Sequence, residues 1–162
     1  MKAVLIGNGP SNRYYDPNME GIKCGFNLTK LNVDVVFVSD AKVINKLNGN
    51  PKVEILKKPF LQRAGKVNIG WNTGQNAYKH LRSLGYTEFD LFGFDLMWSD
   101  TWASETDKVF NKDAWVKDAE EVNMNDKWNS FWNELIDATT RVHAPKGSKL
   151  SFENEYAEIV GH

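Results

Sequence analysis

The sequence predicts an α/β protein: a single Rossmann-like, three-layer domain over residues 1–162, with a mostly parallel sheet and a lid-like loop region at about residues 96–125. Short apolar runs rich in β-branched residues alternate with helix-patterned stretches, which is the order typical of βαβ units. Several runs are apolar at consecutive positions, as in strands covered on both faces. A chain of 162 residues is also long enough for one domain with an ordinary core.

Six segments carry the strand pattern, and two weaker segments suggest short helices. The expected strands are residues 2–6, 22–26, 34–38, 53–56, 89–92 and 141–143. The weaker helical candidates are residues 114–121, inside the lid-like region, and residues 151–160.

Two helices have clear boundary signals. Asp40 can cap a short helix that ends before Gly49. Asn72 or Thr73 can open a second, amphipathic helix that ends at Gly85. A short polar residue before an apolar periodic stretch and a glycine after it are the usual marks of such helices.

A third helix is expected to begin at Asp126, with a wide apolar stripe that includes Trp128 and Trp132. We expect both indoles to belong to the core. Trp71, Trp98 and Trp102 lie instead near the ends of expected strands, where they either stack on a ligand or cover the sheet edge.

Composition excludes several function classes. The formal net charge is −1, so no strong field is present to attract nucleic acid, and no apolar run approaches the roughly 20 residues of a membrane span. The lone Cys24 cannot form an internal disulfide and is expected to be a small buried apolar residue. With no signal-peptide pattern at the start, we expect a cytoplasmic protein.

The opening strand runs into the turn Gly7-Asn8-Gly9-Pro10-Ser11-Asn12, which differs from the dinucleotide fingerprint. Asn12 stands where G-x-G-x-x-G requires glycine, and the second strand ends in Asn27 where a ribose-binding carboxylate is expected. Pro10 also removes a backbone donor. NAD, FAD and ATP bound in their familiar modes are therefore not expected.

Short amide and hydroxyl groups nevertheless follow the expected strands at their carboxyl ends, where ligands of open parallel sheets bind. Such groups can hydrogen-bond a base, a ribose or a phosphate, and a helix start offers backbone N–H groups to an anion. The alternative is that they only form turns and caps. The residues concerned are Asn8, Gly9, Ser11, Asn27, Ser39, Asp40, Asn72, Thr73, Gly74 and Asp95.

Four ordered blocks of the chain resemble the bacterial sialyltransferases of the Campylobacter type. They are NGPS after the first strand, KCGFN at residues 23–27, the block from TGQNA at residue 73 to Asp95, and residues 141–148 with Ala144-Pro145. The block from Thr73 to Asp95 is similar to the family pattern, roughly S/T-G followed by LGY-x-E-I-Y-L-x-G-x-D. Nine residues separate Gly74 from Leu84, and the part from Leu84 to Asp95 matches without gaps. A related Rossmann-like group linked to flagellin glycosylation shares this block. The chain is much shorter than those enzymes.

The resemblance implies a glycosyltransferase that uses a CMP-activated sugar as donor and a glycan as acceptor, inverts the anomeric centre, and needs no metal or separate cofactor. By position, Asn8, Gly9 and Ser11 would lie along the nucleotide, and Asn27 would reach the sugar or phosphate. The residues expected around the donor are Asp40, Asn72, Thr73 and Gly74. The alternative is a non-catalytic nucleotide-binding protein that retains the fold.

The catalytic residues of the family are not matched in full. The loop after Asp95 has no tyrosine to hold the leaving phosphate, and no histidine lies between His80 and His143. His143, at the end of an expected strand, is the candidate general base, with Asp95 as the carboxylate candidate. His80 is expected to be structural, and His162 to be disordered at the terminus.

Overall fold

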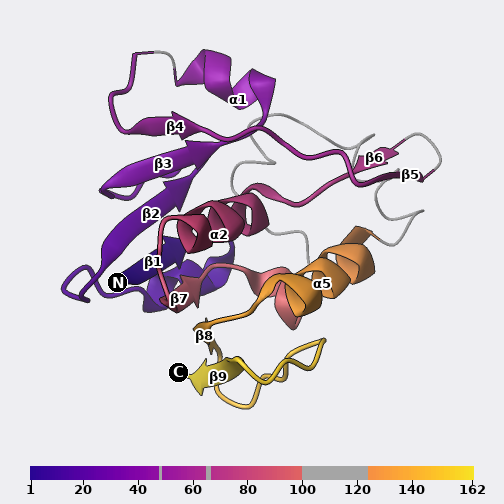
Figure 1. The fold of residues 1–162 in the computed structure, drawn as a ribbon. Coiled ribbons are helices and arrows are strands. Elements are labelled where there is room, and N and C mark those ends of the chain that lie inside the picture. Colours follow the sequence, from indigo (N-terminus) through magenta and orange to yellow (C-terminus); the bar gives the residue numbers. More distant parts are fainter. Residues whose placement is uncertain (48, 65–66, 100–123) are drawn as a thin grey trace.

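The computed structural model describes residues 1–47, 49–64, 67–99 and 124–162. Over these residues, seven strands form a parallel sheet in the order β4-β3-β2-β1-β7-β8-β9 (Figure 1). The predicted α/β class is confirmed. The strands are β1 Lys2–Ile6, β2 Ile22–Phe26, β3 Val35–Val38, β4 Val53–Ile55, β7 Glu88–Phe92, β8 Thr139–Ala144 and β9 Ala157–Gly161.

Helical segments cover both faces of the sheet, which gives three layers. Helices α2 and α5 pack over one face (Figure 1). On the opposite face, residues of η1 and α1 pack against the second core cluster. The bounds are η1 Pro10–Tyr14, α1 Ala41–Lys46, α2 Thr73–Ser83, η2 Asp95–Met97 and α5 Met124–Leu135.

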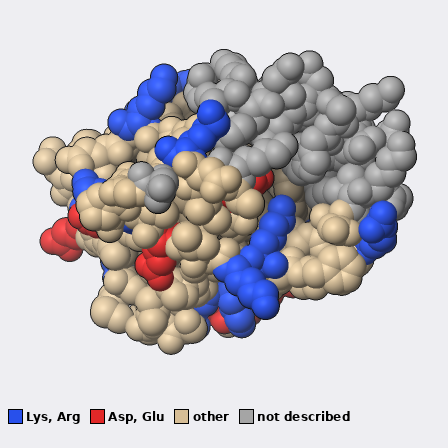
Figure 2. All heavy atoms as spheres, turned by 90° about the horizontal axis from the view of Figure 1, so that it is seen from above, with Lys and Arg blue, Asp and Glu red and all other residues tan. Residues whose placement is uncertain are grey.

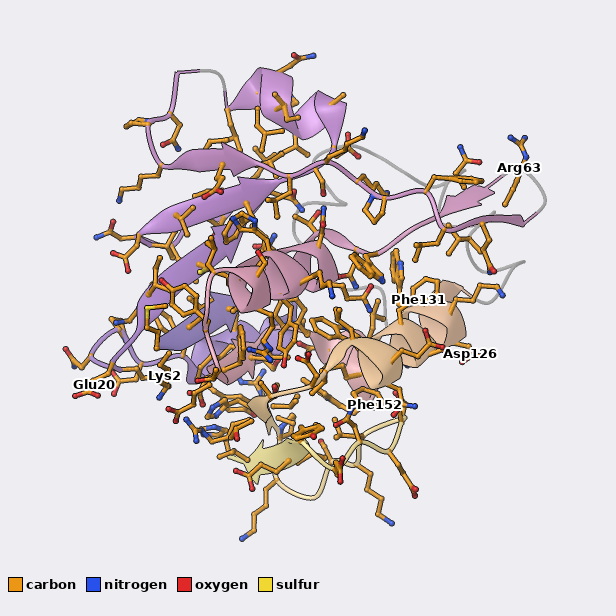
Figure 3. All side chains as sticks on the ribbon, viewed as in Figure 1. Lys2, Glu20, Arg63, Asp126, Phe131 and Phe152 are labelled. Carbon is orange, nitrogen blue, oxygen red and sulfur yellow. The ribbon has the colours of Figure 1, made fainter. Side chains whose placement is uncertain are left out.

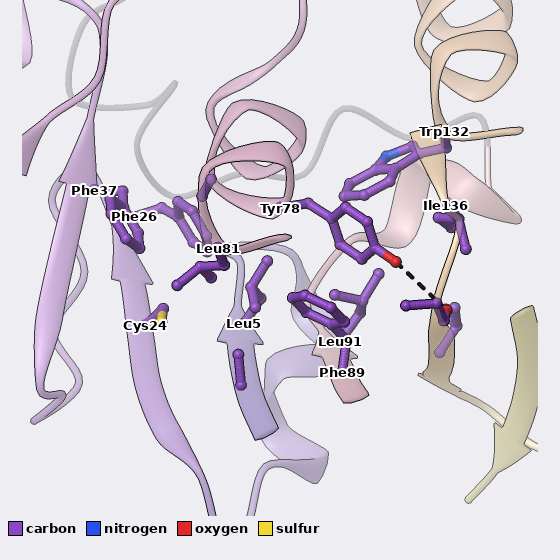
Figure 4. Close-up of a cluster of buried hydrophobic side chains, with 14 of the residues drawn as sticks. Leu5, Cys24, Phe26, Phe37, Tyr78, Leu81, Phe89, Leu91, Trp132 and Ile136 are labelled. Atoms are coloured by element: carbon purple, nitrogen blue, oxygen red, sulfur yellow. Dashed lines mark hydrogen bonds between the residues drawn. The ribbon is translucent and has the colours of Figure 1, made fainter. Parts of the chain in front are cut away.

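The core under α2 and α5 is built from large side chains of both helices and the sheet (Figure 4). Tyr78 of α2 is fully buried, and its hydroxyl lies 3.1 Å from Thr140 Oγ1 of β8. Trp132 of α5 packs edge-on to the Tyr78 ring. Tyr78 therefore joins both helices to the sheet, because the burial of its ring is combined with a satisfied hydroxyl.

The carboxyl ends of β1 and β7 approach so closely that only glycine fits there. The Gly7 N–H donates to Phe92 O at 2.7 Å, and the Gly9 N–H donates to Gly93 O at 2.9 Å. A Cβ on Gly93 would lie 2.3 Å from Gly7 O, and Gly93 has φ +76°. The close approach of β1 and β7 therefore requires glycine in the opening turn, whether or not a ligand binds there.

The segment 151–160, expected to be helical, instead forms an irregular stretch followed by the edge strand β9, Ala157–Gly161. β9 pairs in parallel with β8, with Thr140 opposite Ala157 and Val142 opposite Ile159. Phe152, which precedes β9 and is labelled beside α5 in Figure 3, packs against the core. The apolar residues of this segment recur at three- to four-residue intervals and imitate a helix, but pairing with β8 decides the structure.

A short antiparallel hairpin was missed by the sequence prediction. It consists of β5 Gln62–Ala64 and β6 Val67–Ile69, joined outside the main sheet. Arg63 extends from it away from the body of the protein (Figure 3). The expected helix over residues 114–121 and most of the lid-like region lie outside the described residues.

We predict that Gly93→Ala destabilises the fold far more than Gly147→Ala. Both glycines have positive φ, which costs a non-glycine residue about 1–2 kcal/mol. A Cβ at position 147 meets nothing within 4 Å, whereas one at position 93 collides with the Gly7 backbone. The free energy of unfolding from urea titration measures the difference, and equal losses would contradict the close approach of β1 and β7.

Candidate functional site

The polar residues after β1 and β2 lie at neighbouring positions of one sheet edge. β1 and β2 pair in parallel, so Asn8 and Asn27 follow adjacent strand ends. The Asn8 amide donates to Phe26 O at 3.1 Å, which holds it against the residue before Asn27. Asn27 has φ +55°, a conformation that asparagine tolerates better than most residues.

The Asn27 side chain contains an unsatisfied acceptor. Its Oδ1 is buried from solvent and has no hydrogen-bond partner in the part of the chain that the structure describes. A buried polar atom without a partner costs about 1–3 kcal/mol, so native proteins usually satisfy it with protein, water or ligand. Asn27 is therefore the clearest ligand-binding candidate at this edge.

Helix α2 begins beside the end of β3 and brings the next predicted residues to the same edge. Asn72 caps the helix: its Oδ1 accepts from the Gln75 N–H at 2.8 Å, and the Gln75 side chain accepts from the Asn72 N–H at 3.0 Å. Thr73 Oγ1 lies 2.8 Å from Ser39 Oγ, after β3. This capping box fixes the direction of the first N–H groups of α2.

The backbone N–H groups of Thr73 and Gly74 reach no acceptor among the described residues. Asp40 lies next to Ser39, and its carbonyl accepts from the Val43 and Ile44 N–H groups at the start of α1. The edge formed by Asn8, Asn27, Ser39, Asp40 and the start of α2, called the polar edge below, joins most of the predicted binding residues.

Ser11 and Asp95 are hydrogen-bonded to each other where the ends of β1 and β7 meet. Ser11 is 1% exposed, and its hydroxyl donates to Asp95 Oδ1 at 2.5 Å while accepting from the Gly93 N–H at 3.0 Å. The Ser11 N–H also lies 3.2 Å from both carboxylate oxygens. The two residues therefore hold the turn after β1 onto the end of β7.

The crevice between β1 and β7, where the strand order reverses, is filled by the protein itself. A Cβ on Gly9 would lie 2.4 Å from Asp95 Oδ1, and a Cβ on Gly74 would lie 2.3 Å from the Phe94 ring. Ligands of open parallel sheets usually occupy this crevice. Here the partly exposed polar groups lie on the β2, β3 and α2 side of it.

His143 lies on the sheet face that packs against η1, together with other ionisable side chains. It is 7% exposed, and its Nε2 lies 2.6 Å from Asp90 Oδ1. Its Nδ1 lies 2.8 Å from His162 Nε2. The two predicted catalytic residues thus have different hydrogen-bond partners: Asp95 is bonded to Ser11, and His143 to Asp90 and His162.

Asp90 of β7 is a buried carboxylate held by side chains of the two neighbouring strands, β1 and β8. Lys2 of β1 lies 2.9 Å from its Oδ2, and Arg141 of β8 contacts both oxygens at 3.1 Å. Burial raises the pKa of Asp90, but hydrogen bonds from His143, Arg141 and Lys2 outweigh it and hold that pKa well below its usual value. Asp90 therefore stays ionised at neutral pH.

Two residues of this network were missed by sequence reasoning. His162, expected to be disordered, is ordered by the β8–β9 ladder: its N–H donates to Ala144 O, and its carbonyl accepts from the Lys146 N–H, both at 2.9 Å. Asp90 could have been identified from the sequence, because it is a carboxylate within an otherwise apolar strand. The alternation of Arg141 and His143 on the neighbouring strand places both on the same face as Asp90.

The tryptophan predictions are confirmed in part. Trp132 is 2% exposed, as expected for the core. Trp128 is only partly buried, and its Nε1–H donates to Gly70 O at 3.2 Å. Trp71 and Trp98 are partly exposed, and Trp102 lies outside the described residues. Cys24 is fully buried, which raises its pKa to about 12.

The described surface carries mixed charges. On the face seen in Figure 2, basic and acidic side chains are interspersed over the described residues. The described residues contain no group of three or more His, Cys, Asp or Glu arranged to hold a metal ion. Nor does any helix among them combine the length and the apolar character needed to cross a membrane.

Comparisons with known proteins identify no relative. No protein-family model, no curated protein and no solved structure matches the chain. The resemblance to the sialyltransferases therefore stays a prediction.

We predict that Asp90→Asn lowers the free energy of unfolding by about 3–5 kcal/mol at neutral pH, because it removes the buried partner of two cations. Glu88→Gln is the matched control: Glu88 contacts the same Arg141 but is 45% exposed, so its loss costs about 0–1 kcal/mol.

The pH dependence of this difference has a definite sign. The folded-state pKa of Asp90 is depressed, so its stabilising effect is complete above the unfolded-state pKa of about 3.9 and is lost as the pH falls toward the folded-state value. The stability gap between the native chain and Asp90→Asn should narrow below about pH 4. If the difference in free energy of unfolding between the two proteins stays constant down to pH 2, the depressed pKa of Asp90 is contradicted.

Proposed function

We propose that the chain binds a cytidine nucleotide, either CMP or a CMP-activated sugar, at the polar edge. The observation that carries the proposal is that the buried Oδ1 of Asn27 and the N–H groups of Thr73 and Gly74 all lack a hydrogen-bond partner among the described residues. A ligand that satisfies both must combine a hydrogen-bond donor with an anionic group. A cytidine monophosphate does so through its amino group or its ribose hydroxyls and its phosphate.

The remaining groups of the polar edge fit the same ligand. The hydroxyls of Ser39 and Thr73 are already bonded to each other at 2.8 Å and keep further capacity to accept or donate. Asp40 supplies a carboxylate, which suits the hydroxyls of a ribose. Hydrogen bonds to neutral groups and a helix start hold a single phosphate without a cluster of cations.

We further propose glycosyl transfer as the activity: an acceptor hydroxyl displaces CMP from the anomeric carbon of the sugar with inversion, without a metal. This step follows from the resemblance of the Thr73–Asp95 block to the sialyltransferases. The alternative is nucleotide binding without turnover. It is favoured by one observation: Asp95 is bonded to Ser11, and His143 is bonded at both ring nitrogens, so neither is placed to meet an acceptor directly.

Calorimetric titration of CMP tests the binding site. Asn27→Gly keeps the left-handed backbone and removes the amide, so we predict that the Kd for CMP rises about tenfold, equivalent to about 1.4 kcal/mol. Asn18→Gly is the control, because Asn18 is exposed in the segment that leads to the start of β2, away from the polar edge.

A folded chain that binds no CMP contradicts the proposed function. Equal binding by the native chain and Asn27→Gly contradicts only the role of Asn27. Release of CMP from CMP-sialic acid, measured with and without lactose, then separates transfer from binding alone. Turnover that depends on lactose supports the transferase, and tight binding without release supports the alternative.

A further inference from the structure

His143 and His162 are joined by a direct hydrogen bond between their imidazole rings. Nδ1 of His143 lies 2.8 Å from Nε2 of His162, and the ring centroids are 5.1 Å apart. The other ring nitrogen of His143, Nε2, lies 2.6 Å from Asp90 Oδ1. His143 is 7% exposed, whereas His162 is an exposed residue. The two rings therefore connect the buried carboxylate to the surface of the protein.

The His162 side chain holds the end of an edge strand. In the described sheet, β9 is the last strand and pairs with β8. His162 follows β9, its N–H donates to Ala144 O, and its carbonyl accepts from the Lys146 N–H, both at 2.9 Å. Its ring also stacks on Tyr14 of η1 with centroids 4.5 Å apart. Because the end of an edge strand opens more easily than the centre of a sheet, these side-chain contacts matter for the β8–β9 ladder.

The hydrogen bond between the rings requires one proton between the two facing nitrogens. Ionised Asp90 only accepts, so His143 Nε2 carries a proton and donates it. When both rings are neutral, His143 Nδ1 therefore accepts from the Nε2–H of His162. One added proton preserves the bond, because an imidazolium donates to a neutral imidazole. A second added proton places an N–H group on both facing nitrogens, so the bond is lost.

The two rings differ in what holds them when the bond is lost. His143 is buried, hydrogen-bonded to Asp90, and stacked on Phe92 with centroids 3.9 Å apart. His162 is exposed and keeps only its stacking on Tyr14 among the side-chain contacts described above. Protonation of both rings therefore displaces His162 and leaves His143 in place.

The groups around the pair set the pH at which this happens. The charged and titratable groups on the elements packed around it are Lys2 of β1, Glu88 and Asp90 of β7, Arg141 of β8, Lys146 after β8, Glu158 of β9, and Arg13 and Tyr14 of η1. Burial, and secondly the charge of His143, lowers the pKa of His162. The neutral ring therefore stabilises the folded state fully above the unfolded-state pKa of about 6.5, and this stabilisation is lost as the pH falls below that value.

We propose that the hydrogen bond between His143 and His162 is an acid-sensitive switch on the edge strand β9. At neutral pH, the bond holds the end of β9 on β8. On acidification, protonation of both imidazoles breaks the bond, turns the His162 ring to solvent and opens the β8–β9 ladder from its carboxyl end. The switch is independent of the proposed nucleotide binding, because the polar edge lies on other strands of the sheet.

Amide hydrogen exchange measured by NMR at about pH 7.5 and about pH 5.5 tests the switch. The N–H groups of His162 and Lys146 report on the end of the ladder, and the Gly7 N–H, which donates to Phe92 O, reports on the centre of the sheet. After correction for the intrinsic pH dependence of exchange, we expect the protection of the two end amides to fall several-fold on acidification, approaching about tenfold for the uptake of one proton. The protection of Gly7 should stay constant. Unchanged protection at the end of the ladder, or an equal fall at Gly7, overturns the proposal.

The ring ¹⁵N signals of the native chain supply a second readout, because its three histidines can be assigned individually. We expect one proton shared between His143 Nδ1 and His162 Nε2 at about pH 7.5. The loss of this shared proton and the loss of protection at the end of the ladder should follow the same pH curve. Protection that persists when both rings are imidazolium overturns the proposal.

His162→Gln separates titration from hydrogen bonding, since a glutamine amide can donate to His143 Nδ1 but does not titrate. Its end amides should be equally protected at both pH values. His80→Gln is the matched control, because His80 lies on α2 and pairs with Glu54, and it should keep the native pH response. A native pH response in His162→Gln overturns the proposal. If this variant is unprotected at both pH values, glutamine does not replace the bond, and the ¹⁵N signals of the native chain decide.

Discussion

The close approach of β1 and β7 is the constraint on which the rest of the structure depends. Glycine at positions 7, 9 and 93 lets the two backbones meet, and the Ser11–Asp95 pair closes the junction. This contact occupies the crevice at which parallel sheets usually bind their ligands. It therefore displaces any nucleotide toward the ends of β2 and β3 and the start of α2, where the unsatisfied groups lie.

The same junction separates the two sides of the sheet edge. On one side lie the amides, the hydroxyls and the N–H groups of α2 at which we propose that the nucleotide binds. On the other side, the buried Asp90 gathers Lys2, Arg141 and His143 and extends a chain of hydrogen bonds to His162. The two groups of polar residues thus lie on different strands of one sheet, with the β1–β7 contact between them.

Much of the fold could be predicted from the sequence because local signals agreed with tertiary structure. Apolar runs, several of them at consecutive positions, identified β1 to β4, and Asn72 or Thr73 marked the start of α2. β9 was missed because its apolar residues imitate helical spacing and its conformation depends on pairing with β8. The polar edge could be predicted from strand ends, whereas the partners of Ser11, His143 and His162 are distant in sequence and only the fold reveals them.

The central claim, that a cytidine nucleotide binds at the polar edge, is tested most directly by a ¹H–¹⁵N NMR titration of the chain with CMP. The account predicts saturable shifts of the backbone amides of Asn27, Thr73 and Gly74, with smaller effects at Gly147 on the far side of the β1–β7 junction. The absence of shifts, or shifts confined to β8 and β9, would contradict it.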